Sequence, residues 1–253
     1  MPQQPPPAEE PIGPRVSAIL VVYNQAAELR RALEALERSK ERERLEVLVV
    51  DCGSHDESAQ LDAEFPGINM LRLPHHFGAT KAMNIAIRTA KSELIFLLSP
   101  DVEVQPDTIP RLAAKLEEDE NLAAACPLLT GPEGEPASKV FRIPTRETLG
   151  EWVQGSEPEP APLDLSEESI VVEYPGRDAL LVRKQVIRGI NYFDQRYGEY
   201  WADADLAMQI RRGGKKIRLY PEIRAILHPS ANPLAGDALV ISDKTLGAAA
   251  FLA

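Results

Sequence analysis

Short apolar runs of strand length alternate with segments of helical periodicity through the first half of this chain. The runs are too short to be helices, and they occupy residues 16–22, 45–50, 68–73, 94–98 and 122–129. Between them, apolar residues repeat at helical spacing, for example at Leu29, Ala32, Leu33 and Leu36. This alternation predicts an α/β fold with a Rossmann-like, mostly parallel central sheet and helices on both faces.

The run at 94–98 is followed by residues that can carry chemistry. Five apolar residues without a polar break are typical of a strand covered on both faces, and Pro100 should end that strand by Ser99. Asp101 then lies just past the carboxyl end of a central strand, where ligands bind in open α/β sheets. Asp101 is therefore a candidate ligand for Mg²⁺ or Mn²⁺ beside a phosphate, and an ordinary turn aspartate is the alternative.

Two other strands end in polar residues at the same predicted edge. Tyr23 and Asn24 follow the first strand, and Asp51 follows the second. Because these ends should meet in one crevice, all three residues are candidates for binding a ligand. The Asp51 carboxylate can accept hydrogen bonds from a ribose or a base, although a turn-forming Asp-x-Gly explains it equally well.

A helix predicted from Gly78 to Lys91 carries further candidates. Gly78 permits close backbone approach, and the amino end of the helix favours a diphosphate. Lys81 lies within reach of such a phosphate, and Asn84 belongs to a polar line along the helix. The alternatives are a simple helix-start glycine and a solvated lysine.

A second group of candidates lies late in the chain, around a helix predicted at residues 203–212. Asp203 lies at its amino terminus, where a charged carboxylate is favoured and can act as a general base, and helix capping is the alternative. Asp205 should point away and orient Arg211 or the backbone, and Trp201 either stacks on a sugar ring or belongs to the core. His228 ends a later strand and is a second candidate metal ligand beside Asp101, and a structural histidine is the alternative.

Composition limits the class of protein. The 253 residues carry a net charge of -11 and a pI near 5.0, which argues against a nucleic-acid-binding protein. Cys52 and Cys126 form no metal or redox motif, and no signal sequence or transmembrane run is present, so a cytoplasmic protein is expected. The closing apolar residues 246–253 leave open a contact with a membrane surface or with a second subunit in a homodimer.

The chain is expected to form one domain with irregular segments. Residues 1–14 hold six prolines and predict a disordered tail, and residues 131–169 read as a Pro-rich, acidic loop or linker. Structure should resume at Ile170 and continue to residue 229, with strands at 179–182, 216–220 and 223–228. Residues 230–253 are expected to form a C-terminal tail.

Together these motifs resemble the family 2 glycosyltransferases with the GT-A fold, and most closely their rhamnosyltransferase-like branch. The resemblance covers roughly residues 15–229, with a nucleotide-sugar-binding half at 15–130 and an acceptor-side half at 170–229. It implies that a smaller, mixed region on the acceptor side joins the parallel sheet. The segments that carry it are Val16–Asn24, Val49–Ser58, Phe77–Asn84, Leu97–Asp101, Gly176–Arg183 and Tyr192–Leu206.

The resemblance implies a reaction and a role for each site residue. A UDP-, GDP- or dTDP-sugar would bind with a divalent cation, and an acceptor hydroxyl would attack C1 with inversion. The acceptor would be a glycan or a lipid-linked sugar, in polysaccharide or cell-surface glycan synthesis. By position, Asp203 would be the base, Asp101 the metal ligand, and Tyr23, Asn24 and Asp51 the nucleoside contacts.

Three positions depart from the family pattern. Ser99 replaces the first acidic or amide residue of the metal motif, Ala202 replaces the Glu of the Glu-Asp pair, and His76 stands where Asn is usual. These changes keep open an alternative, a catalytically degenerate relative that binds a nucleotide or a partner protein without turnover. A sugar-phosphate nucleotidyltransferase ranks last, because no Gly-rich, Arg-containing loop follows the first strand.

Overall fold

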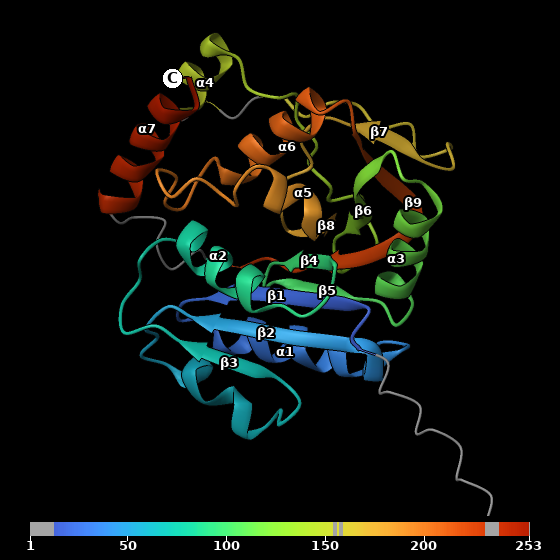
Figure 1. Ribbon diagram of the computed structural model, residues 1–253, viewed down its shortest axis with the longest axis vertical. Helices are drawn as coiled ribbons and strands as arrows, with labels where there is room; N and C mark the ends of the chain where they lie inside the picture. Colours follow the sequence, from blue (N-terminus) through green and yellow to red (C-terminus); the bar gives the residue numbers. More distant parts are fainter. Residues whose placement is uncertain (1–12, 154–155, 157–158, 231–237, 253) are drawn as a thin grey trace, which may run out of the picture.

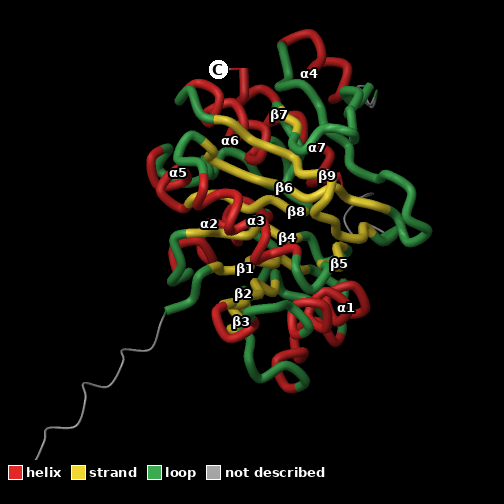
Figure 2. The backbone as a smooth tube through the Cα atoms, turned by 90° about the vertical axis from the view of Figure 1, so that its right-hand side faces the viewer, coloured by secondary structure: helices red, strands yellow, loops and turns green. Residues whose placement is uncertain are grey.

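The computed structural model describes residues 13–153, 156, 159–230 and 238–252 (Figure 1). Within these residues one sheet forms the centre of the molecule, and its strands stack in a curved layer from β3 to β7 (Figures 1 and 2). The strands are β1 (Val16–Val22), β2 (Leu45–Asp51), β3 (Asn69–Arg72), β4 (Leu94–Leu98), β5 (Val102–Val104), β6 (Leu122–Thr130), β7 (Ile170–Val172), β8 (Ala179–Arg183) and β9 (Lys216–Leu227).

The sheet has the order β3-β2-β1-β4-β8-β6-β9-β5, and β7 pairs with β9. The first four strands of this order are parallel. Beyond β4 the pairing is mixed, because β8 is antiparallel to both β4 and β6, whereas β6 and β9 are parallel. The prediction of a Rossmann-like parallel sheet joined to a smaller mixed region is confirmed.

Helices cover both faces of the sheet. They are α1 (Ala26–Glu37), α2 (Ala79–Thr89), α3 (Thr108–Glu118), α4 (Arg146–Val153), α5 (Lys184–Gly189), α6 (Ala202–Arg212) and α7 (Ala238–Leu252), with 3₁₀ helices η1 (Arg42–Arg44) and η2 (Glu57–Ala63). One apolar core lies beneath α1 and α3, and a second lies beneath α2 and α6. Helices α1, α2, α3 and α6 therefore each bury one apolar stripe, as their periodicity predicts.

The first half of the fold follows the sequence prediction closely. Strand β4 ends at Leu98, directly before Ser99 and Pro100, and α6 ends at Gly213 as predicted. Asp56 caps η2, because its Oδ1 accepts a hydrogen bond from the Ser58 amide at 3.0 Å. Helix α3 begins at Thr108, whose Oγ1 accepts from the Gln105 amide at 3.0 Å, rather than at Pro106.

The later segments contain elements that the sequence did not predict. Helix α4 lies within the Pro-rich segment 131–169, and α7 lies within the expected C-terminal tail; the two helices lie side by side (Figure 1). The strands expected at 216–220 and 223–228 form one strand, β9, with a register shift around Pro221. The expectation for residues 1–14 falls almost entirely outside the described residues.

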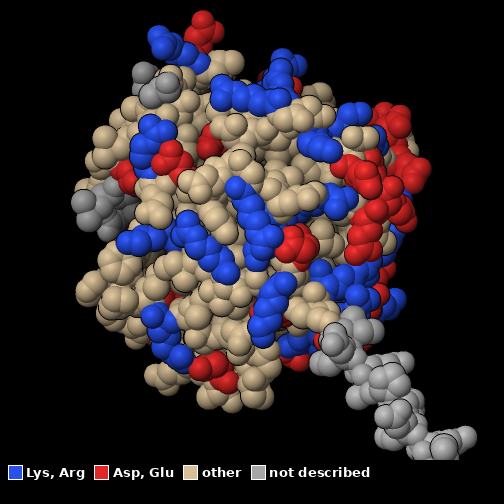
Figure 3. Space-filling view, viewed as in Figure 1, with Lys and Arg blue, Asp and Glu red and all other residues tan. Residues whose placement is uncertain are grey.

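Charge is unevenly spread over the surface. On the face of Figure 3, acidic side chains gather at the edge where β7 and α3 lie, whereas basic side chains are scattered over the centre of the face. Among the described residues, no helix combines the length and the apolar character needed to cross a bilayer.

Candidate active site

A cavity of about 250 Å³ opens at the carboxyl ends of β1 and β4. Tyr23 follows β1, and Ser99 and Asp101 follow β4, so the two strand ends contribute polar groups to the same cavity. Arg177 and Asp178, which precede β8, complete this side of the lining. The convergence of strand ends that the sequence predicts is therefore present for β1 and β4.

Asp101 has the properties of a cation ligand. Its backbone oxygen accepts a hydrogen bond from the His228 amide at 2.9 Å, which fixes the turn after β4. Its Oδ1 is buried and lacks a hydrogen-bond partner among the described residues. A buried carboxylate oxygen without a partner is costly, and a bound cation would satisfy it. Asp101 therefore fits the divalent cation that the sequence implies.

Within the described part of the chain, no group of three or more His, Cys, Asp or Glu side chains is arranged to hold a metal ion by itself. This agrees with the way proteins hold Mg²⁺ on nucleotides, through one or two carboxylates while phosphates and water supply the other oxygens. Asp101, Ser99 and Asp178 all bring oxygen atoms to the cavity lining, and oxygen ligands suit Mg²⁺ or Mn²⁺.

Asp178 is a second carboxylate in the cavity. The residue is exposed and lines the cavity, although neighbouring protein still keeps part of the water away from its carboxylate. Desolvation, followed by the negative charge of Asp101, raises the pKa of Asp178 to about 6, and the charge of Asp203 acts in the same direction. Asp101 and Asp203 therefore both lie within electrostatic reach of Asp178.

Asp203 lies in the first turn of α6 and is held by two hydrogen bonds. Its Oδ2 accepts from the Tyr174 hydroxyl at 3.1 Å, and its Oδ1 accepts from the Ala204 amide at 3.0 Å. Tyr174 is buried, and burial together with the neighbouring charge of Asp203 raises the pKa of its hydroxyl, which stays protonated and donates. Asp203 itself is not among the residues that line the cavity, but its charge acts on Asp178, which is.

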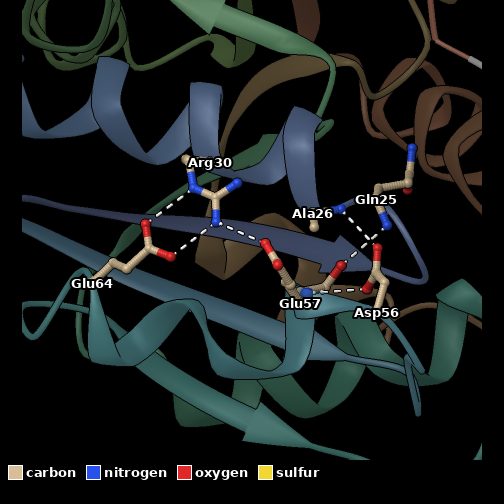
Figure 4. Close-up of polar contacts among 7 residues, drawn as sticks. Gln25, Ala26, Arg30, Asp56, Glu57 and Glu64 are labelled. Atoms are coloured by element: carbon tan, nitrogen blue, oxygen red, sulfur yellow. Dashed lines mark hydrogen bonds and ion pairs between the residues drawn. The ribbon is translucent and has the colours of Figure 1, made fainter.

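The turn after β2 is locked to the start of α1. Asp56 Oδ2 accepts from the Ala26 amide at 3.0 Å, and Arg30 pairs with Glu57 and Glu64 (Figure 4). Asn24 joins the same turn, because its Oδ1 accepts from the His55 amide at 2.8 Å. The ends of β1 and β2 are thus bound to each other before any ligand arrives.

The amino end of α2 already has an acidic partner. The Ala79 amide donates to Glu199 Oε1 at 2.8 Å, and the Thr80 amide donates to the Gly198 oxygen at 2.9 Å. Gly78 has φ of 90°, and a Cβ there would lie 3.1 Å from the backbone of Gly198. Glycine at 78 therefore permits close packing against residue 198, and the amide expected to face a diphosphate is occupied by Glu199.

A family model described as glycosyl transferase family 2 matches residues 17–156, which is more than half of the chain. The chain belongs to glycosyl transferase family 2.

Relatives and solved structures agree with the family and the fold. The N-acetylglucosaminyl-diphospho-decaprenol L-rhamnosyltransferase of Mycobacterium tuberculosis is 24% identical over 243 residues, which cover 87% of this chain and 77% of the relative. An N-acetylglucosaminyltransferase of Mesorhizobium japonicum is 34% identical over 126 residues, which cover 47% of this chain and 29% of the relative. The crystal structure of GalNAc-T7 with UDP, GalNAc and Mn²⁺ has a TM-score of 0.66 and 14% identity, over 86% of this chain and 44% of that one. This likeness confirms the GT-A fold, while the chain spans less than half the length of the last two proteins.

Several residues predicted for the site instead support the structure around it. Asn84 is 1% exposed, and its side chain makes hydrogen bonds of 2.8 and 3.1 Å with the backbone of Phe193. Trp201 is 4% exposed, and its Nε1 donates to the Lys244 oxygen of α7 at 2.8 Å. Both side chains are therefore engaged inside the protein rather than in the cavity.

Three other candidates lie outside the cavity lining. Lys81 is exposed, with its ammonium over the Phe77 ring at 4.7 Å. Asp51 is buried, and its carboxylate accepts from the Ser54 amide at 3.3 Å, as in the turn-forming alternative. His228 contacts Asp101 through its backbone only, because its Nε2 lies 2.9 Å from Glu103 Oε2. Asp205 bonds Gln209 at 3.2 Å, whereas Arg211 pairs with Glu173.

Sequence reasoning missed four residues of the site: Tyr174, Arg177, Asp178 and Glu199. Asp178 and Arg177 lie in the segment Gly176–Arg183. This segment resembles the family, but the resemblance assigns no role to these two side chains. The available signal was their place directly before an apolar strand. Tyr174 and Glu199 gave no signal, because their contacts depend on how distant segments pack.

Proposed function

We propose that the chain is an inverting glycosyltransferase that moves a sugar from a nucleotide-sugar donor to an acceptor hydroxyl. The observation that carries the proposal is that two carboxylates act on the same cavity residue, Asp178. Asp101 lines the cavity with an unpartnered buried oxygen, and the charges of both Asp101 and Asp203 raise the pKa of Asp178. One carboxylate is suited to a cation on a diphosphate, and the other to a proton on an acceptor.

The donor would bind across the ends of β1 and β4. Tyr23 lines the cavity and forms an edge-to-face contact with His76 at 5.1 Å between ring centroids, so its ring is held in place for a nucleoside. Asp101 would hold the cation on the diphosphate, with Asp51 and Asn24 shaping the turn beside it. A bound Mg²⁺ or Mn²⁺ would neutralise the negative charge that develops on the departing diphosphate.

Asp203 would act on the acceptor. Its carboxylate would take the proton of the acceptor hydroxyl while that oxygen forms a bond to C1 of the donor sugar. The bond between C1 and the diphosphate oxygen breaks, and its electron pair leaves with the diphosphate. Attack on the face opposite the leaving group inverts C1. The hydrogen bond from Tyr174 orients the carboxylate for this transfer.

A donor panel tests this proposal. The protein is incubated with UDP-, GDP- and dTDP-sugars and Mn²⁺ or Mg²⁺, and release of the nucleoside diphosphate is followed with and without glycan or lipid-linked acceptors. We expect turnover of at least one donor, and a loss of about 10²–10⁴-fold in Asp203→Asn. Asp205→Asn is the matched control, because Asp205 lies on the same helix and bonds Gln209.

The donor panel together with calorimetry distinguishes the catalytically degenerate alternative from an active transferase. Ser99 and Ala202, which lack the carboxylates usual at these positions, are the observation that favours it. Calorimetry with UDP, GDP and dTDP that shows nucleotide binding, with no turnover of any donor, would select this alternative. No turnover together with an Asp203→Asn variant that behaves as the parent would contradict the transferase.

A further inference from the structure

The turn after β4 supplies one carboxylate, Asp101, to the cavity. Its neighbour Ser99 also lines the cavity but carries a hydroxyl group. A divalent cation on a diphosphate is commonly held by one or two protein carboxylates. The position of a second carboxylate in this cavity therefore bears on how the cation would be held.

Asp178 lies directly opposite Ser99 on the neighbouring segment of chain. Strands β4 and β8 are antiparallel, with Leu98 paired to Ala179, and the next pair in this register joins Ser99 to Asp178. The Ser99 amide donates to the Asp178 backbone oxygen at 2.8 Å, which confirms that the pairing continues. Side chains of directly opposed residues project from the same face, with Cβ atoms about 4.5–5.5 Å apart. A carboxylate at 178 thus occupies the neighbourhood that a carboxylate at 99 would occupy.

Neither cavity carboxylate is fully satisfied by the protein. Asp101 Oδ1 is buried without a partner. Asp178 is exposed and lines the same cavity, and among the described residues no hydrogen bond or ion pair to its carboxylate is found. The nearby guanidinium of Arg177 is directed elsewhere, toward Met83 Sδ at 3.7 Å and the Glu199 oxygen at 3.4 Å. Two carboxylates that repel each other and face one cavity are stabilised when a cation lies between them.

We propose that Asp178 is the second protein ligand of the diphosphate-bound cation and supplies, from the position directly before β8, the carboxylate that Ser99 lacks. This inference rests on the proposed function, because the cation is the one that the nucleotide-sugar donor would bring. Asp101 and Asp178 would provide two oxygen ligands from neighbouring strands. The diphosphate and water would complete the shell.

Direct Mn²⁺ binding tests the assignment without any measurement of turnover. The full chain is titrated with Mn²⁺ in the presence of saturating UDP, and free Mn²⁺ is followed by electron paramagnetic resonance. We expect Asp178→Asn and Asp101→Asn each to weaken Mn²⁺ binding by at least about tenfold. Asp205→Asn should bind as the parent. The double change Ser99→Asp with Asp178→Ser, which returns the acid to β4, should recover most of the affinity.

The outcomes separate this inference from the proposed function. Unchanged Mn²⁺ affinity in Asp178→Asn overturns the inference alone, and so does a loss that the double change fails to recover. A parent that turns over a donor without binding Mn²⁺ also overturns it while the transferase stands. A parent that neither binds a nucleotide nor turns over any donor removes both. Circular dichroism of each variant verifies that the fold is intact.

Discussion

The Tyr174 hydroxyl donates a hydrogen bond to Asp203 Oδ2 across 3.1 Å, joining the segment before β8 to the first turn of α6. The Tyr174 ring packs against Phe141 and Trp152 with centroid distances of 6.2 and 6.1 Å. The ring is therefore fixed by aromatic contacts, and its hydroxyl fixes the carboxylate that we propose as the base.

Tyr174→Phe should keep the aromatic packing and remove this hydrogen bond. We expect kcat to fall about tenfold, with KM for the donor nearly unchanged, because the carboxylate loses its orientation while the donor site is untouched. Steady-state kinetics measure both constants. Tyr220→Phe, on β9, is the matched control. A Tyr174→Phe variant with parental kcat would contradict a positioning role.

The raised pKa of Asp178 predicts how stability depends on pH without metal. Because its pKa is about 6 in the folded chain and 3.8 in the reference state, the folded chain holds the proton more tightly. That contribution is present below pH 4 and is lost as the pH rises toward 6. The groups responsible besides burial are Asp101 and Asp203, which raise the pKa, and Arg177, which lowers it.

Asp178→Asn cannot ionise and should escape this loss. Thermal melts in EDTA should therefore show the variant more stable than the parent at pH 8, with the difference disappearing near pH 4. The opposite trend, with the variant losing stability relative to the parent as the pH rises, would show that the ionised carboxylate is stabilising in the folded chain.

Asn84 is predicted to act on stability more than on donor binding. Asn84→Ala removes both hydrogen bonds to Phe193 and leaves buried backbone groups unpaired, so the free energy of unfolding should fall by about 2–4 kcal/mol. Denaturant unfolding measures this, and Asn69→Ala on exposed β3 is the control. Unchanged stability combined with lost UDP binding would instead restore the nucleotide-contact role predicted from sequence.

Glu199 places a negative charge where the diphosphate is expected. Its Oε1 accepts from the Ala79 amide at 2.8 Å and lies 3.4 Å from His76 Nδ1. Glu199→Gln keeps the hydrogen bond and removes the charge, so UDP should bind about three- to tenfold more tightly by calorimetry. Glu173→Gln, which lies outside the cavity lining, is the control. Weaker UDP binding in Glu199→Gln would mean that the carboxylate contacts the donor directly.

The first half of the fold was predictable because each element carries its own signal. Leu94–Leu98 forms a buried strand, Pro100 follows its end, and Asp56 caps the helix after β2, and each of these depends on local chemistry. Helices α4 and α7 were missed for the opposite reason. They pack against each other, and Trp152 meets Trp201 at 5.0 Å, so tertiary contacts support helices in segments that read as loop and tail.

The candidate site was predictable where one residue follows one strand. Tyr23 and Asp101 follow β1 and β4 and line the cavity, as the position of strand ends in a parallel sheet requires. To predict a role for Asp178, one would have to know which strand pairs with β4. Its place opposite Ser99 arises from an antiparallel pairing of two segments about eighty residues apart in the chain. The roles of Asn84 and Trp201 could not be decided from the sequence, because polar atoms and aromatic rings serve packing and ligand binding equally well.

A crystal structure of the full chain with Mn²⁺ and UDP tests the central claim most directly. The account predicts an anomalous manganese peak in the cavity at the ends of β1 and β4, bound by the Asp101 carboxylate and the diphosphate. Asp203 should lie beyond the diphosphate, on the side where the sugar of a donor would lie. A nucleotide bound elsewhere, or a manganese peak that Asp101 does not contact, would contradict it.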